Sequence, residues 1–292
     1  MRIRIGTRKS RLALAQTELV RADILKAFPH AEIEVVHVTT KGDRVTDRPL
    51  GSIGGSGVFV KEIEQLLLEG EIDIAVHSAK DLPVQLADGL CVAGVLKRGN
   101  PRDMLILRKD AQLTPQARLN IGTGSLRRRQ NMNRLYPNVS FSEIRGNVDT
   151  RLQKLANGEY DGIILACAGI ERIGADLGGF KHIEFGIEEF LPAACQAIIA
   201  IECRSGTETE SIVKAVSDRD TMILFETEKE VLKQLCADCQ TPVSAYSYLS
   251  ENGTEIFLSA SLDPRKILSG SAPVSEHKLL AERLVKGLLH TP

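Results

Sequence analysis

The sequence predicts an α/β protein that ends in a small α+β segment. Two observations indicate the α/β part: short apolar runs rich in β-branched residues alternate with helical patterns, and polar turns separate them in a strand-turn-helix order. The end of the chain differs, because its last 70 or so residues combine two strand-sized runs and a hairpin signal with flanking helices. At roughly 100 to 200 residues per domain, the 292 residues suggest two or three domains.

The composition is that of an ordinary soluble globular protein, with 43% hydrophobic and 26% charged residues. With a net charge of −1, the chain has no overall electrostatic field that would attract it to nucleic acid or to a membrane. No apolar run approaches the roughly 20 residues of a membrane span, and the start M-R-I-R-I-G-T-R-K-S lacks a signal-peptide core. We therefore expect a cytosolic protein without nucleic-acid or membrane partners.

The first predicted lobe begins with a strand, a polar loop and a helix. The strand is Arg2 to Ile5, the loop is Gly6 to Ser10, and the helix Leu12 to Phe28 stops before Pro29. The loop suits either an anion site at the helix N-terminus or a simple capped turn. The lobe continues with a strand at Glu32 to Thr39, a loop at 41–57 whose five glycines suggest a mobile lid, a helix at Phe59 to Leu68, and a strand from Ile72 to Val76.

A second predicted lobe follows a crossing near residues 95–101. Its elements are a strand at Met104 to Leu107, a helix at Leu126 to Leu135, a strand at Phe141 to Ile144, a helix that ends at Asn157, and a strand at Asp161 to Ala166. This alternation predicts parallel-rich sheets. The apolar run Ala193 to Ile201 then suits a buried helix or strand that returns to the first lobe.

The C-terminal segment follows a boundary at Ser217 to Asp220. Its predicted elements are a helix at Thr221 to Cys236, strands at Val243 to Leu249 and Ile256 to Ser261 joined by the hairpin signal Glu251-Asn252-Gly253, and a helix at Ser275 to Leu289. Together the boundaries predict a first domain of residues 1–97 and 194–216, a second of 98–193 and a third of 217–292.

Asp81 is the leading candidate for a catalytic group. The run from Ile72 to Val76 predicts a buried strand, and Pro83 prevents regular structure from continuing beyond the Lys80-Asp81 pair. Ligands of open α/β sheets bind at the C-terminal edge of the strands, where a carboxylate can stabilise a developing cation or transfer protons. Alone, the K-D-x-P pattern favours an exposed turn aspartate, and the other motifs of the chain reverse that preference.

Arginines recur where predicted strands give way to turns or to the first turns of helices. Such cations oppose the helix dipole unless an anion sits between them, and guanidinium groups grip carboxylates and phosphates in bidentate fashion. The pattern therefore predicts a ligand with several acidic groups, against the alternatives of solvated arginines or, for L-R-R-R-Q, nucleic acid. An aromatic content of only 4% disfavours nucleic acid. The arginines are Arg8, Arg127, Arg128, Arg145, Arg151 and Arg172.

The six cysteines are scattered along the chain, which favours free thiols over a disulfide framework. Only Cys236 and Cys239 have a suggestive spacing. Half a zinc site, a redox pair, a single functional thiol and ordinary buried cysteines all remain open, although a zinc site lacks a second C-x-x-C.

Ten motifs in order give the chain a close resemblance, almost from end to end, to the porphobilinogen deaminase (hydroxymethylbilane synthase) family. The motifs are R-K-S-x-L-A-x-x-Q at 8–16, G-G-x-G-x-F-V-K-E at 54–62, D-I-A-V-H-S-x-K-D-x-P at 73–83, N-P-R-D at 100–103, G-T-x-S-L-R-R at 122–128, R-G-N-V-x-T-R-L at 145–152, N-G-E-Y-D-x-I-I-L-A at 157–166, L-P-A at 191–193, I-E-C-R at 201–204 and C-Q-x-P at 239–242.

The resemblance implies a cytosolic transferase that joins four porphobilinogen molecules head to tail, releases ammonia each time, and hydrolyses off the linear product hydroxymethylbilane. It implies a dipyrromethane cofactor linked by a thioether to Cys239. It also implies two α/β lobes like those of periplasmic binding proteins and a small C-terminal α+β domain that carries the cofactor. We expect a monomer that uses no metal.

The family pattern also assigns site residues. The implied catalytic residue is Asp81. The implied cofactor-binding residues are Cys239, Lys80, Asp81, Ser10, Thr123, Ser125, Arg127, Arg128 and Arg145. The implied substrate-binding residues are Arg8, Ser10, Arg145, Arg151, Arg172, Gln196, Gln16 and Phe59.

The chain departs from the family pattern at four places. The family commonly has proline at the position of Arg11, lysine at Ser56 and often at Ser52, E-G-G where this chain has Cys236-Ala237-Asp238, and V-G-Q-G where it has Ala194-Cys195-Gln196-Ala197. These differences bear on loop charge, chain handling and cofactor packing rather than on the reaction.

Overall fold

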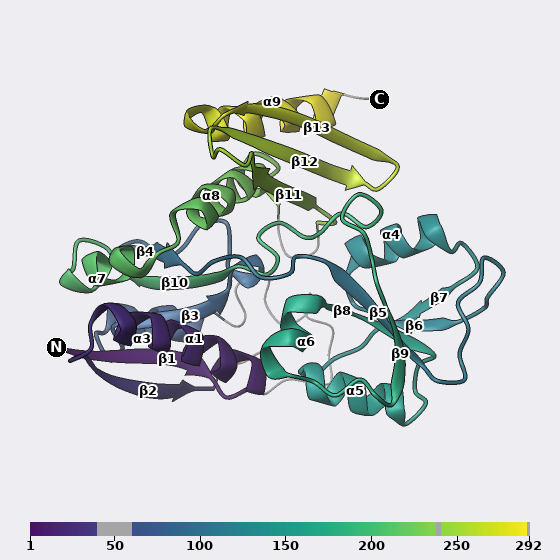
Figure 1. Ribbon diagram of the computed structural model, residues 1–292, viewed down its shortest axis with the longest axis horizontal. Helices are drawn as coiled ribbons and strands as arrows, with labels where there is room; N and C mark the ends of the chain where they lie inside the picture. Colours follow the sequence, from purple (N-terminus) through teal and green to yellow (C-terminus); the bar gives the residue numbers. More distant parts are fainter. Residues whose placement is uncertain (40–59, 238–240, 291–292) are drawn as a thin grey trace. The chain divides into compact units, whose positions relative to one another are not determined.

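A computed structural model describes residues 1–39, 60–237 and 241–290 of the chain (Figure 1). The predicted lid at 41–57, which includes Ser52 and Ser56, lies outside the described residues, as do Phe59, Asp238 and Cys239.

The described chain forms two compact units, residues 1–99 with 198–226 and residues 100–197 with 227–292. Each unit contains a five-stranded sheet with helices, and the second also contains a three-stranded antiparallel sheet near the C-terminus. The predicted fold class, two α/β lobes and a small C-terminal α+β part, is confirmed. The division into three domains stays a prediction.

The first lobe is a five-stranded sheet in the order β2-β1-β3-β10-β4. Helices α1 and α7 pack on one face with the apolar side chains of β1 and β10, and α3 packs on the other face against β3. The elements are β1 (Arg2–Arg8), α1 (Arg11–Ala27), β2 (Glu32–Val38), α3 (Lys61–Leu68), β3 (Ile74–Ser78), a 3-10 turn (Ala79–Asp81), β4 (Leu90–Val95), β10 (Ile199–Arg204) and α7 (Glu208–Val216).

The second lobe has the same general plan, with the strand order β7-β6-β8-β5-β9. Helix α4 packs on one face of this sheet, and α5 and α6 pack on the other. The elements are β5 (Asp103–Arg108), β6 (Asn120–Gly122), α4 (Leu126–Leu135), β7 (Ser140–Ser142), α5 (Val148–Ala156), β8 (Gly162–Ala166), α6 (Cys167–Ile173) and β9 (Phe180–Glu184).

The C-terminal part is a meander of three antiparallel strands covered on one face by α9 (Figure 1). The predicted hairpin at Glu251 to Gly253 is confirmed, because β11 and β12 pair on either side of it. In β12, Ile256, Leu258 and Ala260 alternate onto the buried face of the sheet, whereas Phe257 and Ser259 on the other face are half-buried. The elements are α8 (Arg219–Gln234), β11 (Ser244–Leu249), β12 (Glu255–Asp263), β13 (Lys266–Pro273) and α9 (His277–His290).

The prediction of parallel-rich sheets is wrong, because each lobe has a mixed sheet. In the first lobe β10 runs antiparallel to both β3 and β4, and in the second β5 runs antiparallel to both β8 and β9. These two strands are the first that the chain forms after it passes from one unit to the other. No crossover helix within the same lobe therefore sets their direction, whereas such helices enforce the parallel pairs β1-β2 and β6-β7.

Candidate active site

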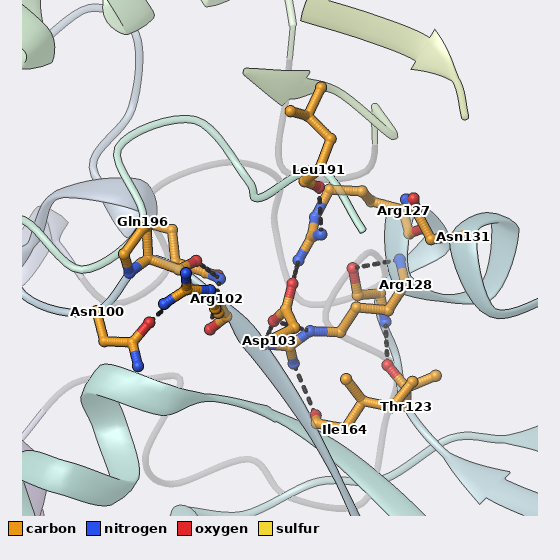
Figure 2. A network of polar contacts seen from close by, with 12 residues as sticks. Asn100, Arg102, Asp103, Thr123, Arg127, Arg128, Asn131, Ile164, Leu191 and Gln196 are labelled. Carbon is orange, nitrogen blue, oxygen red and sulfur yellow. Dashed lines mark hydrogen bonds and ion pairs between the residues drawn. The ribbon is translucent and has the colours of Figure 1, made fainter. Parts of the chain in front are cut away.

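A buried carboxylate joins two arginines in the second lobe (Figure 2). Asp103 opens β5 and is fully buried. Its Oδ2 accepts a hydrogen bond from Arg127 Nη2 at 2.7 Å, and its Oδ1 accepts from Arg128 Nε at 3.0 Å and Nη2 at 2.7 Å. Both arginines stand in the first turn of α4 and are themselves buried. The anion that the helix-terminal arginines required is thus present in the protein, and sequence reasoning missed it although N-P-R-D was noted.

The same guanidinium groups also bind backbone carbonyls. Arg127 Nη1 donates to Leu191 O and Arg128 Nη1 donates to Ile164 O, each at 2.9 Å (Figure 2). Burial lowers the pKa of Arg127, and the charge of Asp103 opposes that effect. Two guanidinium groups share one carboxylate, so the three side chains together carry one excess positive charge. A buried excess charge is costly unless an anion compensates it.

The turn that leads into α4 is built from hydroxyl groups. Ser125 caps the helix by accepting from Arg128 N at 3.4 Å, and Thr123 Oγ1 accepts from Ser125 N at 3.2 Å. These bonds satisfy the N–H groups that a helix start leaves unpaired. The predicted start of this helix is confirmed, whereas cofactor binding by Thr123 and Ser125 stays a prediction.

The other three arginines predicted to bind the ligand in the second lobe lie in different local structures. Arg145 is half-buried in the loop between β7 and α5. Arg151 lies in the first part of α5, and its Nε donates to the carbonyl of Gly146 in that loop at 2.8 Å. Arg172 lies in the last turn of α6, so its predicted position in a turn or first turn is wrong. Its Nη2 donates to Ala197 O at 2.5 Å. Burial lowers the pKa of Arg172 to about 10, which leaves it protonated at neutral pH.

Gln196 lies in a strained and fully buried segment. Its neighbours Cys195 and Ala197 have φ values of 60° and 69°, the left-handed region that costs a residue with a Cβ roughly 1 to 2 kcal/mol. These are the two positions at which the family pattern has glycine. The Gln196 amide donates to Pro101 O at 2.7 Å, which ties the segment to the turn before Asp103. Figure 2 shows Gln196 beside Arg102 of this turn. Its described contacts are with the protein, and its role toward substrate stays a prediction.

In the first lobe, Asp81 ends the 3-10 turn that follows β3 and is exposed. Its predicted position just beyond the C-terminal end of a strand is confirmed. The turn is tied to β10 by Ala79 N, which donates to Ile198 O at 3.0 Å. It is tied to α1 by Gln16, whose Nε2 donates to Ser78 Oγ at 2.8 Å. Gln16 is buried, so in the described contacts it supports the turn, while Lys80 is half-buried beside Asp81.

The predicted loop at Gly6 to Ser10 is shorter than expected, because β1 continues to Arg8. Pairing with β2 along its whole length explains the extension. Ser10 caps α1 and accepts from Ala13 N at 3.3 Å, which is the capped turn that was one of the two alternatives. Arg8 is half-buried at the end of the strand.

The described cysteines are free thiols. Cys236 is exposed just after α8, with a φ of 47°. Burial raises the pKa values of Cys167 and Cys203 to about 12, so neither thiol is activated. Among the described residues, no group of three or more histidine, cysteine or acidic side chains is arranged to hold a metal ion. None of the described helices is both long and apolar enough to cross a membrane.

Comparison with known proteins gives a consistent family. Residues 3–212 match the family model described as porphobilinogen deaminase, dipyromethane cofactor binding domain. Porphobilinogen deaminase of Brevibacillus brevis is 40% identical over 295 residues, which cover 98% of this chain and 93% of the relative. Porphobilinogen deaminase of Streptococcus sanguinis is 40% identical over 292 residues, which cover 98% of this chain and 95% of the relative.

Similarity to solved structures is weaker. The substrate-binding protein of an amino acid ABC transporter matches 81% of this chain and 95% of its own, at 12% identity and a TM-score of 0.42. The match to the effector-binding domain of BenM with its effector benzoate covers 80% of this chain and 93% of the BenM domain, at 16% identity and a TM-score of 0.44. These scores are too low to support an assignment of function.

Proposed function

The chain belongs to the porphobilinogen deaminase family, and from that premise we propose that its buried arginine pair and its Asp81 turn perform the two tasks which the reaction requires. The enzyme joins four porphobilinogen molecules head to tail, with loss of ammonia, and forms hydroxymethylbilane on a dipyrromethane primer. One task is to hold a growing polyanion, and the other is to stabilise a cation. We also assign the enzyme to the cytoplasm as a monomer, as the resemblance to the family implies.

The excess charge around Asp103 is the observation that carries the proposal. Each pyrrole of a dipyrromethane bears an acetate and a propionate, so the group is an anion with several carboxylates. Arg127 and Arg128 together exceed Asp103 by one positive charge in a buried place, which suits a carboxylate partner. When bound, dipyrromethane supplies the pyrrole carbon at which the chain is extended. Ser10, Lys80, Asp81, Thr123, Ser125 and Arg145 are the further residues that we propose to hold it, with Cys239 as the point of attachment.

Substrate carboxylates require cations that can bind them. Arg172 suits this task, because among the described residues its partially buried guanidinium donates to a backbone carbonyl rather than to a carboxylate. We assign the binding of porphobilinogen and the growing chain to this residue together with Arg8, Ser10, Gln16, Phe59, Arg145, Arg151 and Gln196.

Asp81 is assigned to the bond-forming chemistry. When the aminomethyl C–N bond of porphobilinogen breaks, nitrogen leaves as ammonia after gaining a proton, and the ring becomes an azafulvenium cation. An exposed carboxylate at the end of a fixed strand can accept a pyrrole N–H hydrogen bond and stabilise this charge. The terminal pyrrole of the growing chain attacks the azafulvenium through its free α-carbon. Asp81 can also take the proton that this α-carbon loses once the new carbon–carbon bond has formed.

Loss of a single binding arginine tests the cation role. We expect Arg145→Leu and Arg172→Leu each to stall elongation, because an intermediate with more carboxylates needs more cations. Product yield and the intact mass of the protein, which records the attached pyrroles, measure the effect. Arg21→Leu is the control, because Arg21 is an exposed partner of Glu18 on α1. Yield equal to wild type would refute the assignment, and unfolding of a variant would make that arginine structural.

The site of covalent attachment is testable by counting thiols. With Cys239 in a thioether, a thiol-alkylating reagent should modify five of the six cysteines in denatured wild-type protein. Cys239→Ser should lack the covalent pyrroles, whereas Cys236→Ser should keep them and show four alkylated cysteines. Pyrroles retained by Cys239→Ser, seen by peptide mapping, would contradict the assignment. Six alkylated cysteines in active enzyme would contradict covalent attachment through sulfur.

A further inference from the structure

A buried polar pair lies inside the first lobe, close to the Asp81 turn. His77 Nε2 is 2.9 Å from Glu202 Oε2, and the two side chains are 7% and 0% exposed. His77 belongs to β3 and Glu202 to β10, and these strands pair antiparallel. The pair faces α3 from the same side of the sheet as Ala75, which packs in an apolar cluster with Ile63 and Leu67.

This pair is difficult to explain by stability alone. A buried ionic or strongly polar pair commonly gives no more stability than well-packed apolar side chains of similar volume, because desolvation offsets the attraction. Among the described residues, moreover, the second carboxylate oxygen of Glu202 is buried without a hydrogen-bond partner. Glu64 on α3 adds to the cost, since its own burial and the charge of Glu202 raise its pKa. Such a costly arrangement indicates a geometric role.

The strand pairing at Glu202 is also irregular. The pairing of β10 with β4 shifts register between Ile201 and Glu202, so that Ile201 pairs with Gly94 and Glu202 with Val92. The extra residue is Ala93 of β4, the strand that pairs with β10 at this point. A bulge bends its own strand and redirects nearby side chains, and bulges are frequent beside active sites.

What the pair fixes is the end of β3. His77 is the penultimate residue of this strand, and Asp81 is the last residue of the 3-10 turn that follows the strand directly. β10 pairs with this end along the sheet, with Ala200 opposite His77 and Ile199 opposite Ser78. Two further contacts add to this pairing: Glu202 Oε2 meets His77 Nε2, and Ile198 O, just before β10, accepts from Ala79 N. Because a 3-10 turn of three residues has little slack, the direction of β3 at His77 sets the position of the Asp81 carboxylate.

We propose that His77 and Glu202 are positioning residues for Asp81, holding the end of β3 against β10 so that the carboxylate stays where the cation develops. The inference rests on the proposed role of Asp81. Displacement of a catalytic group by about 1 Å can cost about 100-fold in rate. Breaking the pair while keeping the shapes of the side chains should therefore reduce the elongation rate by about 10-fold to 100-fold, with little change in KM.

A double-mutant cycle tests this coupling. Glu202→Gln and His77→Gln are made singly and each in combination with Asp81→Asn, and single-turnover elongation is measured on protein whose mass confirms that the cofactor is loaded. Each pair variant should slow elongation when Asp81 is present. In the Asp81→Asn background the same substitutions should cost less than about twofold, because no carboxylate remains to be positioned.

The matched control is Asp73→Asn. Asp73 directly precedes β3 and accepts three hydrogen bonds from Arg4, two of them from its guanidinium group, so it is a charged link at the opposite end of the same strand. Its loss should lower the unfolding temperature while leaving the elongation rate within about twofold of wild type. This control separates a general loss of stability from misplacement of Asp81.

The outcomes are distinct. Equal slowing by Glu202→Gln in both backgrounds, or no slowing at all, would overturn the inference while leaving the role of Asp81 intact. Wild-type activity of Asp81→Asn alone would instead refute the proposed role of Asp81, and the inference with it. If Glu202→Gln fails to fold, His77→Gln serves the same cycle, because it leaves the strand β10 unchanged.

Discussion

Asp81→Asn is expected to slow single-turnover elongation by about 10²–10³-fold, equivalent to about 3 to 4 kcal/mol of transition-state stabilisation. The substitution keeps the shape of the side chain and removes the charge that faces the azafulvenium cation. Because Asp81 is exposed at the end of its turn, its replacement should leave the fold intact. The measurement is elongation by protein whose intact mass shows that the cofactor is loaded.

Asp81→Glu is the informative companion. It retains the anion but moves it by one methylene, so partial activity and accumulation of enzyme-bound intermediates are expected. If loaded Asp81→Asn elongates within a few-fold of wild type, the aspartate is an ordinary turn residue and the cation is stabilised elsewhere.

Asp103→Asn is expected to destabilise the second lobe strongly, by about 3 to 5 kcal/mol, and to prevent stable cofactor loading. The substitution leaves the two buried guanidinium groups of Arg127 and Arg128 without their shared carboxylate. Urea unfolding measures the loss of stability, and intact mass measures loading. Asp110→Asn is the matched control, because Asp110 is a largely exposed partner of Arg108. That control should change the free energy of unfolding by less than about 1 kcal/mol.

Wild-type stability of Asp103→Asn would show that the arginines do not depend on this carboxylate. The same network makes Arg128 unlike Arg145. Arg128→Leu removes a partner of Asp103 as well as a cation, so it should lose stability together with activity, whereas Arg145→Leu should lose activity alone.

Local signals in the sequence predicted many of the helices and strands. The helix α4 was predicted with its observed bounds, because a serine cap, an amphipathic run and a following Pro137 mark its two ends within the sequence. The strand β9 was missed, since it is a largely exposed run at the edge of its sheet and lacks the apolar pattern of a buried strand. Strands β4, β6 and β13 and helices α6 and α7 were also missed.

Which side chains pair within the site could not be predicted from local sequence, because the paired residues are far apart in the chain and meet only in the folded protein. Asp103 and Arg128 are 25 positions apart, and His77 and Glu202 are 125 positions apart. Sequence reasoning identified Arg128 as a cation in need of an anion, but only the pairing of strands and the packing of α4 show which carboxylate meets it. In the same way, the family pattern has glycine at Cys195 and Ala197, but the left-handed backbone that suits glycine there became visible only in the structure.

The place of β10 in its sheet imposes an order on folding during synthesis. This strand lies between β3 and β4, yet the chain completes β4 at Val95 and reaches β10 only at Ile199. A ribosome that adds roughly 5 to 20 residues per second takes about 5 to 20 s to cover that interval. Meanwhile β3 and β4 each carry an unpaired edge, to which strands of neighbouring nascent chains can add. The strands of the second lobe fall within one continuous stretch, 103–184, so this lobe can close its sheet first, while the first lobe waits for Arg204 to emerge.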